Sequence, residues 1–336
     1  MKKVKVGING FGRIGRQLTK LIMERDEIDI VSINDLANIE SCAHLFKYDS
    51  SYGIYKESVE IDGDDLVLKN KRIKKFTERD PAQIKWDSLG VEIVIESTGI
   101  FTKKEQAEKH LSDITKKVII SAPATDEDLT IVLGVNEDQY DPIIHHVVSN
   151  ASCTTNCVAP MVKILNDNFG VKYALMSTIH SFTNDQSVLD QPHSDLRRSR
   201  TASSNIIPTT TGAAKAVVQV IPEMKGKIDG MAYRVPTPSV SVTDLTVLLE
   251  KETDANTINQ SFESASKKSF KGLLEYSDLP LVSQDFKGNS HSVIIDSLST
   301  IQVEKNFFKI VGWYDNEWGY ANRTCDLLSL ISSKLA

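Results

Sequence analysis

The fold is decided by the stretch Val4-Lys5-Val6-Gly7-Ile8-Asn9-Gly10-Phe11-Gly12-Arg13-Ile14-Gly15-Arg16. Its first half alternates apolar and other residues like a short strand, and its glycines form the spacing Gly-x-Gly-x-x-Gly. Gly10 permits a tight turn, Gly12 lets backbone approach a pyrophosphate, and Gly15 lets a helix pack closely on the strand. The following residues predict that helix through an apolar face of Ile14, Leu18, Leu21 and Ile22. The stretch therefore predicts a dinucleotide-binding strand, loop and helix.

An acidic residue follows at the expected place. Residues 28–33 read as a second strand, which ends at Asn34-Asp35, 25 positions after Gly10. A carboxylate there accepts hydrogen bonds from the ribose hydroxyls and repels a 2′-phosphate, so Asp35 predicts NAD rather than NADP. The alternative interpretation is a surface turn residue, because Asp is common at strand ends.

The alternation of strands and helices continues through the first half of the chain. Apolar runs predict strands at residues 91–96, 117–123, 129–134 and 143–148, a hairpin at 67–76 and a helix at 103–111. This order is typical of a doubly wound parallel sheet of the Rossmann type. Ligands of such sheets lie beyond the carboxyl ends of the strands, where Ser97, Thr98 and Ser121 also fall.

A second informative stretch is Ser149-Asn150-Ala151-Ser152-Cys153-Thr154-Thr155-Asn156-Cys157, followed by residues 158–165 with helical apolar spacing. Cys153 falls where a strand turns into a helix, and the N–H groups and dipole of a helix start favour a thiolate. The same N–H groups suit an oxyanion or a phosphate. The alternative is buried packing, the common role of a cysteine beside an apolar helix. Cys157, inside that helix, is interpreted as structural.

The pattern changes after this helix. Long strands are predicted at 171–182, 240–250, 292–297 and 307–314, with helices at 212–220 and 254–268. Successive strands with few crossover helices favour a mainly antiparallel sheet in an α+β domain. We therefore expect an NAD-binding domain of residues 1–151 with a C-terminal helix at 316–336, and a catalytic domain of residues 152–315. A long polar loop at 181–204 carries an arginine cluster, which either binds phosphate or forms surface salt bridges.

Bulk properties exclude several classes of protein. The chain has 336 residues and a net charge of -6, which argues against broad nucleic-acid binding. Its four cysteines show neither a disulfide framework nor a zinc-binding spacing, so no metal is expected. No apolar run approaches the roughly 18 residues of a membrane span, and the N-terminus lacks a signal-peptide pattern. We expect a cytoplasmic protein with reduced thiols.

The ordered motifs, taken together, resemble the phosphorylating glyceraldehyde-3-phosphate dehydrogenase family over essentially the whole chain. The motifs that carry the resemblance are residues 9–16, 149–157, 183–186, 195–198, 211–215, 234–236 and 313–320. The resemblance implies a glycolytic enzyme whose partners are glyceraldehyde 3-phosphate and inorganic phosphate, and it implies a homotetramer. From the net charge and the lack of a membrane-length apolar run, we expect no nucleic-acid or membrane partner.

The resemblance also implies a mechanism. Cys153 attacks the aldehyde to give a hemithioacetal, and His180 takes the hydroxyl proton as hydride leaves for NAD. The resulting thioester is cleaved by inorganic phosphate, which releases 1,3-bisphosphoglycerate. Taken alone, His180 would be read as a core or surface histidine.

Further site residues are assigned by the resemblance, which also includes Gly10 and Asp35 from the fingerprint above. Thr183 and Arg234 would bind the substrate phosphate, Arg198 would approach from the long loop, and the attacking phosphate would meet Ser152, Thr154, Thr211 and Gly212. The cofactor would meet Gly10, Arg13, Ile14, Asp35, Arg79, Ser121 and Asn316. Two positions depart from the family pattern: Gln191 replaces a frequent leucine in a loop that bears on NAD strictness, and Ile54 replaces a usual arginine.

Three other functions remain open at this point. Erythrose-4-phosphate dehydrogenase is a close sibling, although residues 183–186 and 211–215 look like the glycolytic version. A hydrolytic thiol enzyme would use Cys and His but would have no use for the Gly10 to Asp35 fingerprint. A non-enzymatic surface or RNA-binding role is the alternative from a different class.

Overall fold

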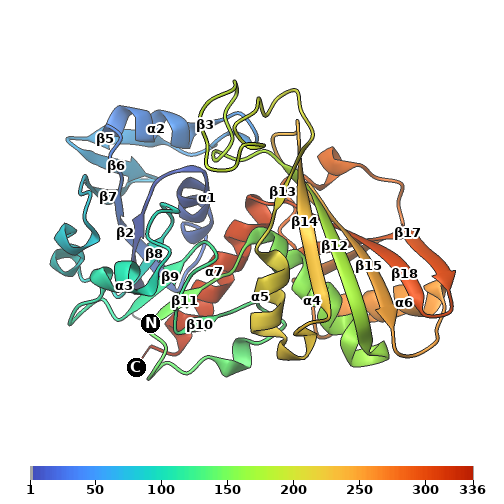
Figure 1. The fold of residues 1–336 in the computed structure, drawn as a ribbon. Helices are drawn as coiled ribbons and strands as arrows, with labels where there is room; N and C mark the ends of the chain where they lie inside the picture. Colours follow the sequence, from blue (N-terminus) through green and yellow to red (C-terminus); the bar gives the residue numbers. More distant parts are fainter. Residues whose placement is uncertain (1–2, 336) are drawn as a thin grey trace. The chain divides into compact units, whose positions relative to one another are not determined.

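The computed structural model describes residues 3–335, which form two units (Figure 1). The first unit consists of the chain up to Ile131, residues 139–151 and the chain from Ala321 onward. The second unit consists of residues 132–138 and 152–320. The first unit is therefore built from three separate pieces of chain.

The first unit is organised on a nine-stranded sheet with the order β10-β11-β9-β8-β1-β2-β7-β6-β5. Its strands are β1 (Val4–Asn9), β2 (Ile28–Asn34), β5 (Val59–Asp62), β6 (Asp65–Leu68), β7 (Lys71–Phe76), β8 (Ile93–Glu96), β9 (Lys117–Ile120), β10 (Leu129–Thr130) and β11 (Val147–Ser149). The strands from β10 to β7 pair in parallel, and β6 and β5 add an antiparallel edge. The chain leaves the sheet centre in both directions, so its topological switch point lies between β1 and β8. The predicted doubly wound parallel sheet is confirmed.

Shorter elements complete the first unit. They are α1 (Arg13–Ile22), α2 (Ile39–Lys47), α3 (Lys104–Ala107), the 3-10 turns η1 (Pro81–Gln83), η2 (Trp86–Leu89) and η3 (Glu108–His110), and the strand pair β3 (Tyr48–Asp49) and β4 (Gly53–Ile54). The helix predicted at 103–111 is thus divided between α3 and η3.

The glycine loop between β1 and α1 has the predicted form. Gly10 has φ +94°, which favours glycine, and a Cβ on Gly15 would lie 2.1 Å from the Gly10 carbonyl oxygen. Helix α1 can therefore lie this close to the loop only because residue 15 has no side chain. Val6 and Ile8 of the strand and Leu18 of the helix are fully buried.

Four predicted strands are wrong in extent. The strand predicted at 117–123 ends at Ile120, and the one predicted at 292–297 continues to Glu304. The other two are shortened by side-chain caps. The strand predicted at 143–148 is only Val147–Ser149, because Asp141 accepts the Ile143 N–H and holds the preceding residues in an exposed turn. The strand predicted at 129–134 ends at Thr130. There the Asn136 side chain accepts the Val132 N–H and bends the chain, although the residues stay buried. Apolar runs alone do not report such side-chain caps.

The second unit is organised on a seven-stranded sheet with the order β13-β14-β12-β15-β18-β17-β16. Its strands are β12 (Val171–Ser181), β13 (Ile207–Thr210), β14 (Ile228–Val235), β15 (Ser241–Leu249), β16 (Leu274–Ser277), β17 (Val293–Glu304) and β18 (Phe307–Tyr314). Only the β12–β14 and β16–β17 pairs are parallel, so the expected mainly antiparallel sheet is confirmed. Its helices are α4 (Cys153–Phe169), α5 (Ala213–Val220) and α6 (Ala255–Lys267), with η5 (Pro222–Met224) and η6 (Ser283–Phe286).

The last helix, α7 (Trp318–Ser333), joins the first unit from Ala321 onward. It is held there by hydrogen bonds from Asn150 to Thr324 and from Arg25 to Asp326, and by buried Leu327, Leu328 and Ile331. The helix expected at 316–336 begins at Trp318.

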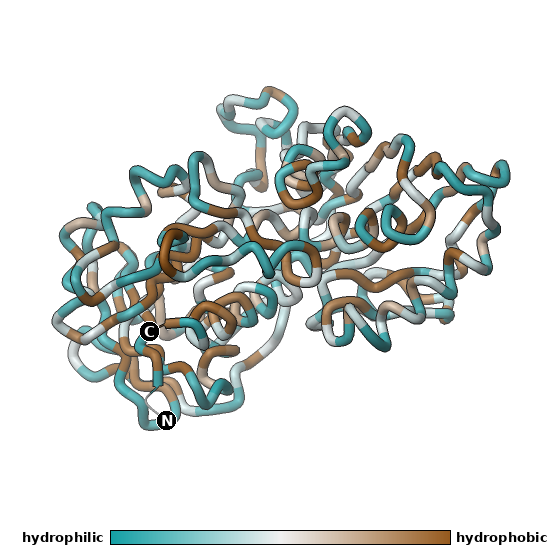
Figure 2. The backbone as a smooth tube through the Cα atoms, turned by 90° about the horizontal axis from the view of Figure 1, so that it is seen from below, coloured by the Kyte–Doolittle hydropathy of each residue, from teal (hydrophilic) through white to brown (hydrophobic). Residues whose placement is uncertain are grey.

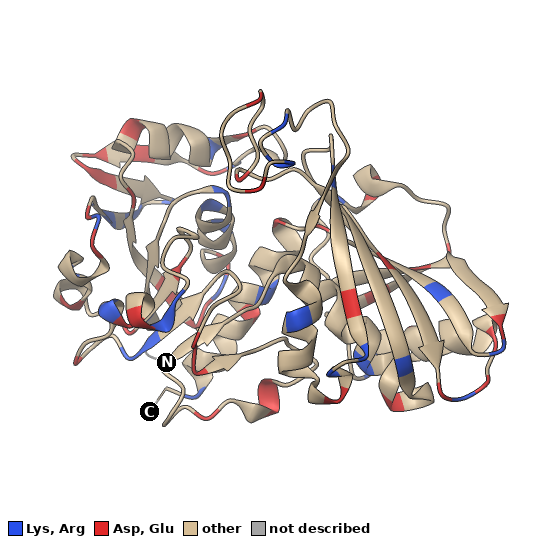
Figure 3. Ribbon diagram, viewed as in Figure 1, with Lys and Arg blue, Asp and Glu red and all other residues tan. Residues whose placement is uncertain are grey.

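Apolar residues are concentrated inside each unit, and charged residues of both signs are spread over both units. Within each unit, apolar segments gather on the inner strands and helices, and peripheral turns are mostly hydrophilic (Figure 2). Lysine and arginine are interspersed with aspartate and glutamate on both units (Figure 3). None of the helices within residues 3–335 has the length and apolar character needed to cross a membrane.

Candidate active site

Cys153 is the first residue of α4 in the second unit. The preceding residue, Ser152, is the N-cap, and its hydroxyl accepts a hydrogen bond of 3.0 Å from the Thr155 N–H. Ala151 has φ +54°, an uncommon conformation for a residue with a side chain. This turn ends the approaching segment abruptly and leaves the Cys153 side chain at the helix start, as the sequence predicted.

His180 lies opposite this thiol. It stands near the end of β12, and its Nε2 is 3.4 Å from the Sγ of Cys153. The two residues are 27 positions apart, and the length of β12 carries the histidine to the start of α4. The two predicted catalytic residues are therefore within contact distance.

Arg234 and the Ser181 carbonyl both lie next to Nδ1, on the side of the His180 imidazole away from the thiol. Because β14 pairs in parallel with β12, Arg234 stands directly beside His180. Its Nη1 lies 2.6 Å from Nδ1 of His180 and 3.1 Å from the Ser181 carbonyl oxygen, which itself lies 2.7 Å from Nδ1. Ser181 and Arg234 thus compete for Nδ1. When Nδ1 carries its proton and donates to Ser181, the Nε2 lone pair faces the thiol.

Burial controls the protonation of the pair. Burial raises the pKa of the Cys153 thiol, while the Arg234 charge and hydrogen bonds with Thr154 work to lower it. Burial, reinforced by Arg234, lowers the pKa of His180 to about 3. The backbone N–H groups of Cys153 and Thr154 at the helix start work to lower the thiol pKa, as the sequence predicted, but burial outweighs them. A raised thiol pKa beside a lowered imidazole pKa favours transfer of the proton from Sγ to Nε2 during attack on the substrate.

Cys157 shares a pKa raised by burial with Cys153 but differs from it in position and partners. It is fully buried one turn further along α4, and its Sγ faces the Gly312 carbonyl oxygen at 3.7 Å. Burial raises the pKa of its thiol to about 12. These features agree with the structural role inferred for it.

The predicted phosphate-binding residues occupy different surroundings. The Thr154 hydroxyl turns into the core, 2.8 Å from the Tyr314 hydroxyl. Thr211 and Gly212 precede α5, where the Thr211 hydroxyl accepts the Ala213 N–H and a Cβ on Gly212 would meet no atom within 4 Å. Thr183 lies just beyond β12, and its carbonyl accepts the Gln186 N–H.

Arg198 is held within the long loop. Its guanidinium donates to Asp185 at 2.6 Å, to the Thr209 hydroxyl at 2.9 Å and to the Thr210 carbonyl at 3.2 Å. The salt-bridge interpretation of the arginine cluster is therefore confirmed for this residue, and phosphate binding by it stays a prediction. It forms a surface salt bridge, and that bridge places it beside the residues that lead to Thr211.

Sequence reasoning missed Tyr314 and Ser241. The Tyr314 ring meets the His180 ring edge-on with centroids 6.0 Å apart, and its hydroxyl bridges Thr154 and Thr178. Ser241 and Ser181 donate to the carboxamide oxygen of Asn316 at 3.1 and 2.8 Å, which orients this predicted cofactor residue. Every second residue along β15 and β18 is buried, including Ser241 and Tyr314. This period of two is the signal that could have placed both residues on the buried face of the sheet.

In the first unit, the residues around the glycine loop fit a dinucleotide. A Cβ on Gly12 would meet no atom within 4 Å, and Gly12 is the N-cap of α1, so the helix start offers room for a pyrophosphate. Asp35 accepts the Phe11 N–H at 2.8 Å and the Ala37 N–H at 2.9 Å. Its carboxylate is therefore fixed beside the loop, as a ribose-binding acid requires.

Comparison with known proteins identifies the family. Residues 4–104 match the NAD binding domain of glyceraldehyde 3-phosphate dehydrogenase, and residues 152–316 match its C-terminal domain. The chain belongs to the glyceraldehyde 3-phosphate dehydrogenase family.

Relatives that carry this name are similar over their whole length. The chain is 55% identical to glyceraldehyde-3-phosphate dehydrogenase of Priestia megaterium over 98% of this chain and 99% of the relative. It is 54% identical to glyceraldehyde-3-phosphate dehydrogenase 1 of Bacillus cereus and to the enzyme of Geobacillus stearothermophilus, with the same coverage. The chain is thus an NAD-dependent oxidoreductase.

The remaining cofactor residues predicted from the dehydrogenase family lie in the first unit. Arg13 pairs with Asp49 at 3.3 Å and lies over the Tyr52 ring, while Ile14 is half-buried beside it. Arg79 is exposed, and the Ser121 N–H donates to the Glu96 carbonyl at 2.9 Å. No cluster of metal-ligand side chains occurs among the residues that the structure describes.

Proposed function

We propose that this chain oxidises D-glyceraldehyde 3-phosphate and transfers inorganic phosphate to the product, giving 1,3-bisphosphoglycerate while NAD is reduced. The observation that carries this proposal is the 3.4 Å contact between Cys153 Sγ and His180 Nε2, beside the Arg234 guanidinium. A nucleophile, a base and a phosphate-binding cation are the groups that thiol-dependent oxidation of a phosphorylated aldehyde requires.

The first half of the reaction uses the pair as a nucleophile and base. Sγ of Cys153 bonds to the aldehyde carbon while its proton passes through Nε2 of His180 to the aldehyde oxygen, which gives a hemithioacetal. Nε2 then takes the hydroxyl proton as the carbon–hydrogen bond breaks with both electrons. Bound NAD supplies the hydride acceptor. The carbon retained on Cys153 becomes a thioester.

The second half releases the product. An oxygen of inorganic phosphate bonds to the thioester carbon, and the carbon–sulfur bond breaks. Cys153 leaves as a thiolate and is neutralised by the proton that His180 holds. The thioester keeps the free energy of aldehyde oxidation in a form that phosphate can accept. Hydrolysis by water would dissipate that free energy.

Two anion sites follow from these steps. We assign Arg234 and Thr183 to the substrate phosphate, since an anion that draws Arg234 away relieves its crowding against His180. For the attacking phosphate we assign Ser152, Thr154, Thr211 and Gly212, with Arg198 approaching from its salt bridge to Asp185. Thr154 would act through its backbone N–H, because its hydroxyl is bonded to Tyr314.

The wider organisation is proposed on the same basis. Residues 1–151 with the helix at 316–336 serve as the NAD-binding domain, and residues 152–315 as the catalytic domain. Arg13, Ile14, Arg79, Ser121 and Asn316 are assigned to the cofactor with Gly10 and Asp35. The protein is proposed to be a cytoplasmic homotetramer, in keeping with its four free cysteines.

The direct test is NADH formation by the purified protein from NAD and glyceraldehyde 3-phosphate, with and without inorganic phosphate. Sustained turnover that requires phosphate and prefers this triose over erythrose 4-phosphate is expected. A single burst that is independent of phosphate would contradict the second half of the mechanism. Preference for erythrose 4-phosphate would contradict the substrate.

The role of Cys153 is tested by Cys153→Ser. The less nucleophilic hydroxyl should lower kcat on the order of 10³-fold or more, while the Kd for NAD stays unchanged. Cys157→Ala is the matched control, because Cys157 lies on the same helix away from the imidazole, and it should retain activity. Appreciable turnover by Cys153→Ser would remove this residue from the mechanism.

A further inference from the structure

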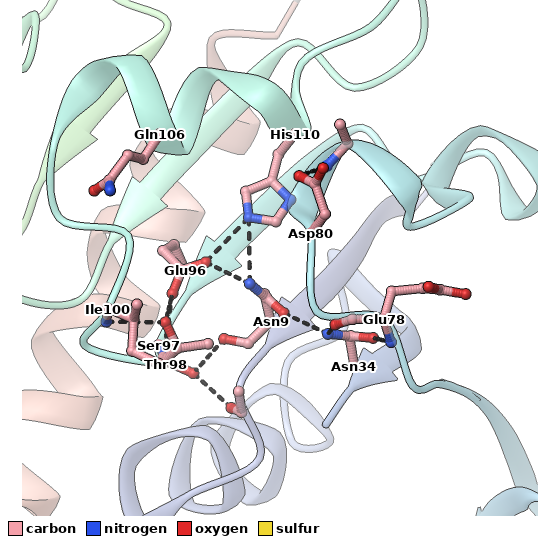
Figure 4. A network of polar contacts seen from close by, with 12 residues as sticks. Asn9, Asn34, Glu78, Asp80, Glu96, Ser97, Thr98, Ile100, Gln106 and His110 are labelled. Carbon is pink, nitrogen blue, oxygen red and sulfur yellow. Dashed lines mark hydrogen bonds and ion pairs between the residues drawn. The ribbon is translucent and has the colours of Figure 1, made fainter. Parts of the chain in front are cut away.

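A buried polar network lies next to the glycine loop of the first unit, with the Glu96 carboxylate at its centre (Figure 4). One carboxylate oxygen accepts from Asn9 Nδ2 at 2.6 Å and from His110 Nε2 at 3.0 Å. The other accepts the N–H and the hydroxyl of Thr98. The side chain is fully buried, so these four donors take the place of water around a carboxylate.

The donor role of His110 is fixed by a third residue. Trp86 Nε1 lies 3.0 Å from Nδ1 of His110, and an indole nitrogen can only donate. Nδ1 must therefore accept, so the single proton of the neutral ring lies on Nε2 and points to Glu96. The histidine side chain is fully buried, and both ring nitrogens have partners.

The network extends to the chain segments that carry the proposed NAD-binding residues. Asn9, which precedes Gly10, accepts from Asn34, which precedes Asp35. Asn34 in turn exchanges two hydrogen bonds with the backbone of Glu78, which precedes Arg79. The Glu96 backbone carbonyl accepts the Ser121 N–H. One buried side chain thus lies at the centre of four separate segments, as Figure 4 shows for Asn9, Asn34 and Glu78.

The contact between residues 97–98 and the glycine loop leaves the loop little freedom to move. The Ser97 hydroxyl donates to the Gly10 carbonyl at 2.7 Å, and the Ser97 N–H donates to the Asn9 carbonyl at 2.7 Å. A Cβ on Gly10 would lie only 2.7 Å from the Thr98 nitrogen. The backbone of residues 97–98 therefore supports the loop directly, and a displacement of Thr98 displaces Gly10.

We propose that Glu96 is a positioning residue for NAD binding, which acts through Asn9, Thr98 and His110. The inference rests on the proposed function in one respect, since it takes Gly10, Asp35, Arg79 and Ser121 as cofactor residues. Glu96 itself lies next to the loop. Its carboxylate sets the relative positions of the strand ends of β1, β2 and β8, and so holds the cofactor residues in the arrangement that binds NAD before the ligand arrives.

The test is Glu96→Gln, which keeps the shape of the side chain and replaces one acceptor oxygen by a donor NH₂. Every neighbour that Glu96 accepts from is a donor, so the new NH₂ meets a donor in either orientation. Trp86 prevents His110 from changing its tautomer to accommodate it. We expect the Kd for NAD to rise about ten- to hundredfold, measured by calorimetry on the full-length protein. The KM for NAD should rise while kcat at saturating NAD stays within about twofold.

Asp65→Asn is the matched control. Asp65 is also a buried carboxylate of the first unit, and it accepts from Arg72 Nε at 2.8 Å and from the Lys75 N–H at 3.1 Å, away from the glycine loop. It should lower the apoprotein melting temperature and leave the Kd for NAD within twofold. If both variants weaken NAD binding equally, the effect is one of stability alone and the proposal is overturned.

Thr98→Val tests the same network with a smaller change. It removes the hydroxyl that donates to Glu96 and accepts the Ile100 N–H, and the Kd for NAD should rise several-fold in a protein that still folds. An unchanged Kd in both Glu96→Gln and Thr98→Val would overturn the inference while leaving the proposed function intact. Failure of the unaltered protein to bind NAD would instead overturn the proposed function, and the inference with it.

Discussion

The two units each contain a buried histidine with polar partners, and the partners differ in kind. His110 in the first unit accepts from Trp86 on one nitrogen and donates to Glu96 from the other. His180 in the second unit has Ser181 and Arg234 competing for Nδ1, and its Nε2 faces the Cys153 thiol at 3.4 Å. Burial is nearly complete for both, so burial does not separate them.

The difference shows what makes a buried histidine reactive. The hydrogen bonds of His110 fix one tautomer and leave no place for its proton to go. The surroundings of His180 leave its proton without a single preferred position and offer a titratable sulfur on the other side. An imidazole positions other groups when its partners are fixed donors and acceptors, and it transfers protons when one partner can exchange a proton with it.

The largest expected effect tests the reactive histidine. His180→Gln keeps polarity and removes the base, so kcat should fall about 10²- to 10⁴-fold, and alkylation of Cys153 by iodoacetamide should also slow. The apoprotein melting temperature should change little, because the ring's closest partner is a crowded cation. A kcat within tenfold of the unaltered enzyme would contradict the role of His180 as the base, and with it the contrast between His180 and His110.

The corresponding substitution in the first unit, His110→Gln, should lower stability and leave the reactivity of Cys153 unchanged. His110→Gln leaves either Trp86 or Glu96 without its partner, and should lower the unfolding free energy by about 1–3 kcal/mol. This loss is measured as the apoprotein melting temperature, which shifts by about 2–4 °C for each kcal/mol in a domain of this size. The rate of Cys153 alkylation should remain as in the unaltered protein. A slowed alkylation would show that the two histidines are not separable.

A smaller effect is expected at Asp128, a carboxylate whose hydrogen-bond donors are fixed. Burial works to raise the pKa of Asp128, but hydrogen bonds from Lys104, Val147 and His146 outweigh it and hold this pKa below its usual range. A carboxyl with a depressed pKa in the folded state stabilises above its unfolded value of about 3.9, and that contribution disappears as pH falls through the folded pKa.

Asp128→Asn should therefore destabilise the protein by about 1 kcal/mol at pH 7. The difference from the unaltered protein should shrink as the pH is lowered to 4 and below. Urea unfolding at a series of pH values measures both quantities. A difference that is independent of pH would mean that the charge of Asp128 contributes nothing.

The sequence predicted those parts of the molecule that depend on local chemistry. The glycine spacing predicted the turn at Gly10 and the close packing at Gly15 because both are consequences of a missing side chain. The capping residues predicted the helix start at Cys153. The proximity of His180 was implied only by resemblance to the family, since no local pattern encodes which residue a strand brings opposite a helix start.

The parts that were missed depend on contacts between distant segments. Glu96 and Asn9 are 87 positions apart, and Asn9 and His110 are 101 apart, so no periodicity connects them. Strand β14 was missed because its burial does not alternate, although it carries Arg234 to the side of His180. Asn136 and Asp141 shortened two predicted strands through side-chain caps that compete with the sheet.

The three-piece construction of the first unit has a consequence during protein synthesis. Its final piece begins at Ala321, so the nascent chain cannot complete this unit until Ala321 and the residues of helix α7 after it have left the ribosome. The second unit has all of its residues by Tyr320. At roughly 5–20 residues per second, many seconds separate the synthesis of the first Rossmann strands from that of helix α7. The unit whose synthesis begins first is thus the one whose chain is completed last.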